Sequence, residues 1–175
     1  GCLQMEVTVH GKMAHAAIPT TGVDALQGAT KILNALYAQN TLYQQVTSKV
    51  EGITHPYLNV GRIEGGTNTN VVPGKVMFKL DRRMIPAEHP VEVEANIRQV
   101  IADAAAESKG ITVEIKRMLL ANSMKPLAGN KPLVDAIQKH GGYARIHAHG
   151  RLHGILDDIA AMGPDGLDPI EPPPQ

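Results

Sequence analysis

Apolar and polar residues alternate at the start of the chain, where the apolar positions are Leu3, Met5, Val7 and Val9. A period of two over eight residues predicts a β-strand with one buried face. Residues 57–64, 71–81 and 111–116 carry the same type of pattern. Pro73-Gly74 interrupts the stretch 71–81, and because proline cannot donate to a strand ladder, a bulge or an edge is predicted there. The core-facing positions of that stretch are predicted to be Val76, Phe78 and Leu80.

A first helix is predicted over residues 22–38. Its apolar positions recur at helical spacing and are Leu26, Ala29, Ile32, Leu33, Leu36 and Tyr37. Thr21 and Asp24 have the form of a capping box, with a hydroxyl at the cap and an acid three residues later. The polar, irregular segment 41–55 predicts a loop.

A second helix is predicted to begin at Pro90, because proline suits the first helical position. Its apolar stripe consists of Val93, Ile97, Val100, Ile101 and Ala104. Lys109-Gly110 supplies a basic last turn and a glycine stop.

The predicted order is strand, helix, strand, strand, helix, strand. Such an order packs most simply as an α+β, ferredoxin-like βαββαβ sandwich, a four-stranded, mostly antiparallel sheet with both helices on one face. We assign this domain to residues 1–122, a linker with a short helix to residues 123–142, and an appended tail, with a helix at about 152–162, to residues 143–175.

Composition narrows the possible function classes. The chain of 175 residues is 43% hydrophobic, enough for a packed core, and carries 17 basic and 17 acidic residues. A formal charge of zero argues against a nucleic-acid binder. No apolar run approaches a membrane span of about 18 residues, so no membrane partner is expected. Gly1 leads directly into a strand pattern without a signal peptide, and the single Cys2 fits a reducing cytoplasm.

Three polar side chains at or beyond predicted strand ends are candidates for chemistry. His15 lies on a predicted loop and can exchange protons near neutral pH. Asn70 offers a donor and an acceptor, and Arg83 can hold a carboxylate with two parallel hydrogen bonds. Together they would suit an anionic substrate whose carbonyl becomes negative in the transition state. Each also has an ordinary explanation, as a loop histidine, a turn asparagine and a solvated arginine.

The candidates belong to a longer series of fragments. These are His10-Gly11-Lys12-Met13-Ala14-His15-Ala16-Ala17-Ile18-Pro19, then Gly22 and Ala25, Gly65-Gly66, Asn70-Val71-Val72-Pro73 and Asp81-Arg82-Arg83. In this order they resemble the dimerisation or lid domain of the zinc amidohydrolases, a family that includes aminoacylase, carboxypeptidase G, acetylornithine deacetylase and succinyl-diaminopimelate desuccinylase. The resemblance covers about residues 1–122.

This resemblance implies a homodimer and a separate catalytic domain that carries zinc. The lid histidine, here His15, reaches into the partner's active site and steadies the tetrahedral oxyanion. Asn70, Arg83 and Gly66 map to substrate-binding positions, with Arg82 as the alternative in register. The implied substrates are N-acyl amino acids or small peptides.

The chain lacks the metal-binding signature of that family. It contains neither the adjacent Glu-Glu pair nor the His-x-Asp strand end that hold the metal in the resembled enzymes. We therefore expect no cofactor on this chain, zinc in the catalytic domain of the parent enzyme, and no amide hydrolysis by the isolated chain.

The tail has a second resemblance. Residues 145–150 and 162–173 resemble a strand–helix–strand piece of the uroporphyrinogen decarboxylase and corrinoid methyltransferase superfamily, which is far too short to close an eight-stranded barrel. Two alternatives stay open beside the lid domain: a stand-alone ferredoxin-like interaction module, and a tail-derived fragment of such a barrel enzyme. Zinc-ligand segments flanking this chain would decide for the lid domain.

Overall fold

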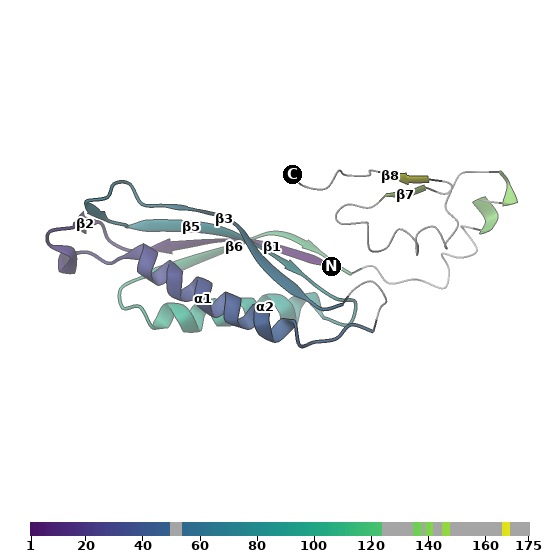
Figure 1. The fold of residues 1–175 in the computed structure, drawn as a ribbon, viewed down its shortest axis with the longest axis horizontal. Helices are drawn as coiled ribbons and strands as arrows, with labels where there is room; N and C mark the ends of the chain where they lie inside the picture. Colours follow the sequence, from purple (N-terminus) through teal and green to yellow (C-terminus); the bar gives the residue numbers. More distant parts are fainter. Residues whose placement is uncertain (50–53, 124–134, 138, 142–144, 148–165, 169–175) are drawn as a thin grey trace. The chain divides into compact units, whose positions relative to one another are not determined.

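The computed structural model describes residues 1–49, 54–123, 135–137, 139–141, 145–147 and 166–168. The chain divides into two compact units, Gly1–Met124 and Lys125–Gln175. The first unit contains β1 (Cys2–His10), β2 (Ala14–His15), the 3₁₀ helix η1 (Pro19–Thr21), α1 (Ala25–Tyr43), β3 (Tyr57–Gly65), β4 (Val71–Val72), β5 (Lys75–Arg83), α2 (Pro90–Ala106) and β6 (Thr112–Ala121) (Figure 1). In the second unit, β7 (Arg145–His147) and β8 (Gly166–Asp168) form a parallel pair.

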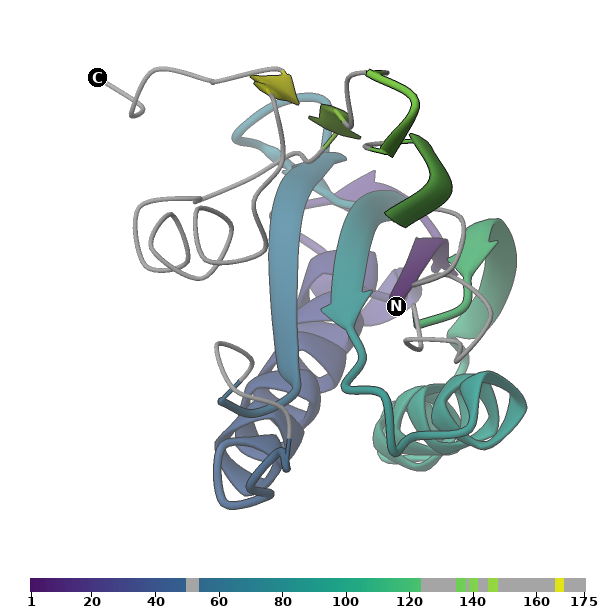
Figure 2. The same cartoon turned by 90° about the vertical axis from the view of Figure 1, so that its right-hand side faces the viewer.

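The main sheet has the strand order β3-β5-β1-β6. Each pair of neighbours is antiparallel. Both α1 and α2 lie on the same face of this sheet, as the end-on view shows (Figure 2). The predicted ferredoxin-like α+β fold is therefore confirmed. We call the opposite face of the sheet its outer face.

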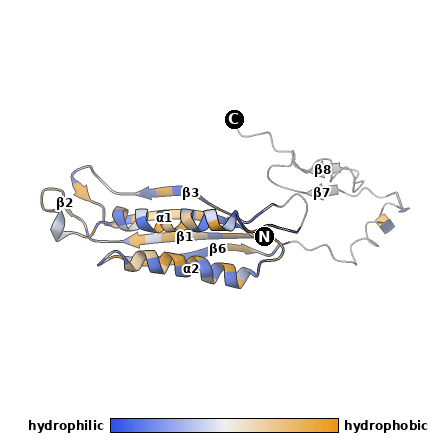
Figure 3. Ribbon diagram, turned by 60° about the horizontal axis from the view of Figure 1, so that its bottom comes forward, coloured by the Kyte–Doolittle hydropathy of each residue, from blue (hydrophilic) through white to orange (hydrophobic). Residues whose placement is uncertain are grey.

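Alternation along the two central strands builds the core. The inward residues of β1 and β5 are almost completely buried, and they are Leu3, Met5, Val7, Val9, Val76, Phe78 and Leu80. Residues of α1 and α2 close the same cluster, including Ile32, Leu36, Ile97 and Ile101. Both helices carry apolar and polar positions, which appear in Figure 3 as orange and blue segments of the ribbon. The predicted inward faces of both strands are confirmed.

The start of α1 differs from the prediction. The helix begins at Ala25, and its N-cap is Asp24, whose carboxylate accepts from the backbone N–H of Leu26 at 2.8 Å and of Gln27 at 3.1 Å. Thr21 instead ends the 3₁₀ helix η1, and its hydroxyl donates to the carbonyl of Ile18. The predicted capping box is wrong, because the acid caps the helix alone.

The end of α1 also differs, since the helix continues to Tyr43 through part of the predicted loop. Asn40, a weak helix former, is buried and accepts the backbone N–H of Leu58 on β3 at 2.7 Å. This tertiary hydrogen bond explains why a segment with poor local helix signals is helical.

The helix α2 begins at Pro90 as predicted but ends at Ala106, before the expected stop at Lys109-Gly110. The backbone turns there, because Ser108 N–H donates to the carbonyl of Ala105 at 2.9 Å. A basic residue does interact with the end of α2, but it comes from α1: Lys31 donates a hydrogen bond to the carbonyl of Glu107.

The strand β6 is longer than predicted and reaches Ala121. A bulge opposite Gln4 and Met5 of β1 leaves Met118 between the paired residues Arg117 and Leu119. The extra residue shifts the alternation by one position, so the second half of the strand does not continue the period of the first.

The predicted strand over residues 71–81 is two strands. β4 pairs with β2 in a small antiparallel ribbon, and β5 joins the main sheet after the break at Pro73-Gly74. The predicted tail helix at 152–162 lies outside the described residues. Among the helices that the structure describes, none is long and apolar enough to cross a membrane.

Candidate substrate-capping site

His15 is the last residue of β2 and pairs with Val71 of β4, while Ala14 pairs with Val72. It therefore lies on a short strand, where the sequence predicted a loop. The backbone N–H of Ala16 donates to the carbonyl of Asn70 at 2.9 Å and extends the ribbon by one bond. His15 and Asn70 are thus brought to the same end of the ribbon.

The His15 ring is exposed, but it is oriented by its own turn. The backbone N–H of Ala17 donates to Nδ1 of His15 at 3.1 Å. Because Nδ1 accepts this hydrogen bond, the neutral ring carries its proton on Nε2. Nε2 has no hydrogen-bond partner among the described residues, so the ring presents one N–H donor to a ligand.

Backbone hydrogen bonds tie the ribbon to the main unit. They join Gly11 N to Gly74 O, Lys12 N to Val23 O, Val23 N to Lys12 O, and Ala25 N to Pro73 O, each at 2.8 Å. A Cβ on Gly11 would lie 2.1 Å from the carbonyl oxygen of Val23, so glycine is needed for this close approach. The short ribbon that carries the His15 donor is therefore held to the rest of the first unit by backbone hydrogen bonds.

Asn70 and Gly66 lie in the exposed turn that leads to β4. The Asn70 carbonyl is used by the ribbon, whereas its side-chain amide makes no hydrogen bond to the part of the chain that the structure describes. Gly66 has a φ of +78° and open space where a Cβ would stand. The turn therefore offers an unused amide and an unshielded backbone to a ligand.

A hollow of about 690 Å³ lies on the outer face beside this turn. Its lining includes Gly66, Gly74, Met13, Lys75 and Met77. Met13 directly precedes β2, so the hollow is continuous with the segment that carries His15. Sequence reasoning missed Met13 and Lys75. The signal that pointed to a site here was the group of glycines, which leaves the backbone uncovered.

Arg83 lies at the opposite end of the sheet. In the ladder, Lys75 pairs with His10, whereas Arg83 pairs with Cys2. Between them β5 runs for nine residues, or about 26 Å at roughly 3.3 Å per residue. In Figure 1 the ribbon of β2 lies at one end of the first unit and the N-terminus at the other. The structure does not bring Arg83 together with His15 in the same chain.

The two adjacent arginines of β5 point to opposite faces. Arg82 is completely buried on the helix side, where it pairs with Glu88 and lies 3.9 Å above the ring centre of Tyr43. Arg83 is on the outer face with 67% of its side chain exposed. Only Arg83 is therefore accessible to a ligand.

Asp81 lies beside Arg83 and accepts hydrogen bonds from three side chains. Its donors are Arg83 Nε at 2.7 Å, Gln4 Nε2 at 3.0 Å and Cys2 Sγ at 3.4 Å. Burial raises the pKa of the Cys2 thiol, and the charge and hydrogen bond of Asp81 raise that pKa further. Cys2 is therefore a protonated donor at neutral pH.

Comparison with known proteins decides the family. The family model described as peptidase dimerisation domain matches residues 1–109. The chain belongs to this family. An acetylornithine deacetylase of Myxococcus xanthus is 30% identical over 115 residues, which cover 63% of this chain and 30% of that protein. An N-acetyl-L-cysteine deacetylase of Bacillus subtilis is 34% identical over 86 residues, covering 49% and 19%.

Solved structures show the same fold. The aminobenzoyl-glutamate utilization protein from Klebsiella pneumoniae superposes with a TM-score of 0.59 at 24% identity, over 79% of this chain and 32% of that one. The dimerisation-domain chain spans about a third of the length of its curated acetylornithine deacetylase relatives. The resemblance of the tail to the uroporphyrinogen decarboxylase superfamily has no support in these comparisons.

The described residues of the dimerisation domain do not form a metal centre. Among them, no group of three or more His, Cys, Asp or Glu side chains is placed to hold an ion. A zinc site needs about four such ligands, or three with an open position. The residues described here therefore do not by themselves make a zinc site.

Proposed function

We propose that this chain supplies the dimerisation and substrate-capping part of a zinc-dependent amidohydrolase that cleaves N-acyl amino acids or small peptides. Three relatives are named for acetylornithine, N-acetylcysteine and N-acetyldiaminopimelate deacetylation. All three compounds are N-acyl amino acids, with an amide to cleave and a carboxylate to recognise. The zinc and its ligands belong, in this proposal, to a catalytic domain outside the described residues.

We also propose that the enzyme is cytoplasmic, because the free thiol of Cys2 suits a reducing compartment.

The orientation of His15 carries this proposal. Its Nε2–H is a donor whose tautomer is fixed by the Ala17 N–H, so it is ready to meet negative charge without rearrangement. Attack on an amide carbonyl places that charge on the carbonyl oxygen. We assign His15 to stabilise this oxyanion and the Asn70 amide to bind the substrate beside it, with the uncovered backbone of Gly66 at the rim.

Arg83 is proposed to bind the substrate carboxylate, which matches its planar guanidinium in a two-bond arrangement. An N-acyl amino acid is far shorter than the roughly 26 Å between the two ends of β5. One substrate therefore does not contact His15 and Arg83 of the same chain. Each site of the proposed homodimer takes His15 and Asn70 from one chain and Arg83 from its partner.

His15→Ala in the full-length enzyme tests the function. Loss of one oxyanion donor lowers kcat by about 100- to 1,000-fold, with a smaller change in substrate binding. Folding is expected to remain intact, because the exposed ring leaves no cavity. The readouts are kcat, KM and melting temperature on an N-acetyl amino acid.

His10→Ala is the matched control, since His10 is a half-exposed histidine at the same end of the sheet that faces Glu114 at 3.6 Å. Its kcat is expected to stay at the wild-type value. A large fall in melting temperature for His15→Ala, with turnover per folded molecule unchanged, would show that His15 is a structural residue.

A further inference from the structure

We infer that Asp81 is a positioning residue, which aims the guanidinium of Arg83 at the carboxylate of the substrate. The inference rests on the proposed function, in which Arg83 binds that carboxylate. It adds a second residue to the recognition of the substrate and a reason for the Asp81-Arg82-Arg83 order in the sequence.

The geometry of the pair leaves the useful part of Arg83 free. Asp81 and Arg83 are two residues apart on β5, so both side chains stand on the outer face. The bond of 2.7 Å uses Nε of Arg83. Both terminal nitrogens have no partner among the residues that the structure describes. A carboxylate approaching end-on therefore meets two parallel N–H donors.

Asp81 is itself held more firmly than an ordinary surface carboxylate. One oxygen accepts from Arg83, and the other accepts from Gln4 and Cys2 of the neighbouring strand β1. The side chain is only 23% exposed. Its position is thus fixed by two strands of the sheet, and Arg83 is anchored to that fixed point.

A second Arg–carboxylate pair in the same sheet shows the difference. Arg62 and Glu64 are also two residues apart on one strand and are joined at 2.8 Å. The Glu64 side chain is 53% exposed, and no other described residue donates to it. A pair of that kind contributes little to stability and fixes little. The hydrogen bonds that hold Asp81 in place restrict Arg83 to one orientation, because a long side chain otherwise samples many rotamers.

The test compares two substrates on the full-length enzyme: an N-acetyl amino acid and its C-terminal carboxamide. The measured quantity is the ratio of kcat/KM for the two, which reports recognition of the carboxylate. Arg83→Ala is expected to abolish this preference. Asp81→Asn is expected to lower it about tenfold, the lower end of what loss of an orienting partner costs at metal sites. The change is expected in KM for the carboxylate substrate, with kcat on the carboxamide unchanged.

Two further variants make the test specific. Gln4→Met removes one support of Asp81 but keeps the ion pair, and it is expected to lower the preference less than Asp81→Asn does. Glu114→Gln is the control, because Glu114 is an exposed carboxylate on the same face, outside the hollow, and faces His10 across two strands at 3.6 Å. Its preference is expected to equal that of the wild type.

The outcomes separate this inference from the proposed function. A preference that survives Arg83→Ala overturns both, because the arginine then does not bind the carboxylate. A preference lost in Arg83→Ala but intact in Asp81→Asn overturns the positioning role alone, and so does a lower melting temperature with unchanged preference. If Asp81→Asn does not fold, Gln4→Met decides the question by the same ratio.

Discussion

Arg82 and Arg83 show how strand alternation gives two identical residues different roles. Val76, Phe78 and Leu80 occupy the inward row of β5, and Arg82 is the next member of that row. An inward arginine must have partners, and Glu88 and Tyr43 provide an ion pair and an aromatic face. Arg83 belongs to the outward row and stays in solvent.

Replacing the two arginines therefore has different effects on stability. Arg82→Ala is expected to lower the free energy of unfolding by about 3–5 kcal/mol, because it leaves the half-buried Glu88 carboxylate without its cation. Arg83→Ala is expected to change that free energy by at most about 0.5 kcal/mol, as at other exposed positions. Urea denaturation of both variants measures this contrast, and equal losses would contradict the burial difference.

Alternation predicts which of the two arginines is exposed, but it does not predict what each one contacts. Glu88 is six residues away from Arg82 in the sequence, and Tyr43 is on another element. The tautomer of His15 could not be predicted from the sequence either, because it depends on a turn that places the Ala17 N–H next to Nδ1. Such contacts follow from backbone geometry, which residue types alone do not specify.

The carboxylate of Asp24 caps the start of α1. Asp24→Ala is expected to lower the free energy of unfolding by about 1 kcal/mol, because two N–H groups of the first turn lose their acceptor. Thr21→Ala is expected to cost less, since its hydroxyl bonds an exposed carbonyl before the helix. Chemical denaturation of both variants tests the assignment of the cap, and a larger loss in Thr21→Ala would restore the capping box.

Glu94 connects α2 to β6 and makes this packing sensitive to acid. Burial alone would raise the pKa of its carboxyl, but hydrogen bonds and charge from Arg98 and Arg117 outweigh this and lower the pKa. A lowered folded-state pKa means that the unfolded chain binds the proton more tightly. The stabilisation is therefore complete above the unfolded value of about 4.5 and is lost as the pH falls through the lower folded pKa.

The free energy of unfolding of Glu94→Gln is accordingly expected to fall less steeply than that of the wild type as the pH is lowered from about 5 to about 3. The measurement is the free energy of unfolding by urea across that range. Glu92→Gln is the control, because Glu92 lies in the first turn of the same helix. An unchanged acid slope in Glu94→Gln would contradict the assignment.

Elements were predictable where one pattern extends over a whole element. The alternation of β1 and the apolar stripe of α2, for example, correctly predicted which side of each element is buried in the core. Prediction failed where a local irregularity interrupts the pattern, as at Met118 in β6. It also failed at β2 and β4, because two residues in each strand are too few to show a period.

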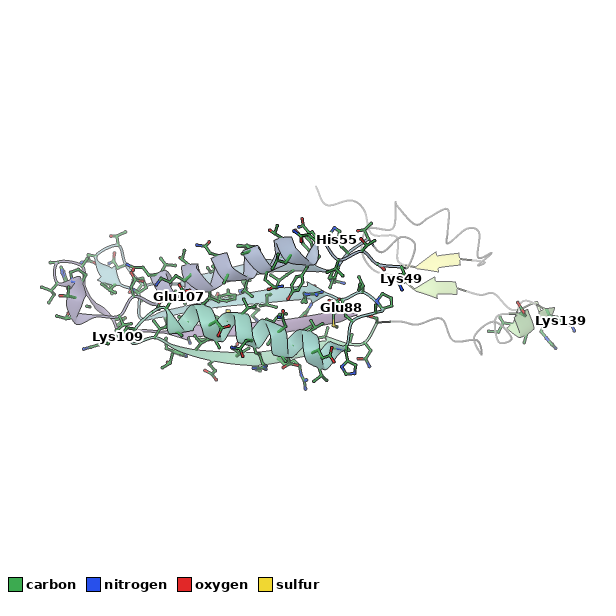
Figure 4. All side chains as sticks on the ribbon, turned by 90° about the horizontal axis from the view of Figure 1, so that it is seen from below. Lys49, His55, Glu88, Glu107, Lys109 and Lys139 are labelled. Carbon is green, nitrogen blue, oxygen red and sulfur yellow. The ribbon has the colours of Figure 1, made fainter. Side chains whose placement is uncertain are left out.

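At the scale of the molecule, the sheet separates two groups of functional candidates. The ribbon with His15 and Asn70 lies at one end, and Asp81 and Arg83 lie at the other. In Figure 4, Glu107 and Lys109 mark the first end of the unit, and Glu88 marks the second. The sequence motifs contain His15, Asn70, Asp81 and Arg83, but the distance between the two groups becomes evident only once β5 is seen to be one uninterrupted strand. In the homodimer proposed above, this separation requires that each site takes residues from both chains.

Hybrid dimers test this arrangement. A dimer of one His15→Ala chain and one Arg83→Ala chain has one site with both defects and one site with neither. Random mixing of the two impaired variants gives half hybrids, so we expect about a quarter of the wild-type activity on the N-acetyl amino acid to return, following the twofold symmetry of the assembly. The measurement is turnover after the subunits have exchanged, with each variant alone as the baseline.

The control for the mixing experiment pairs two defects at the same end of the sheet. His15 and Asn70 come from the same chain in this arrangement, so a hybrid of His15→Ala and Asn70→Ala has one defect in each site, and its activity is expected to stay low. Recovery with Arg83→Ala but not with Asn70→Ala would locate the three residues in two chains. No recovery with Arg83→Ala, despite confirmed subunit exchange, would show that His15 and Arg83 do not reach one substrate from different chains.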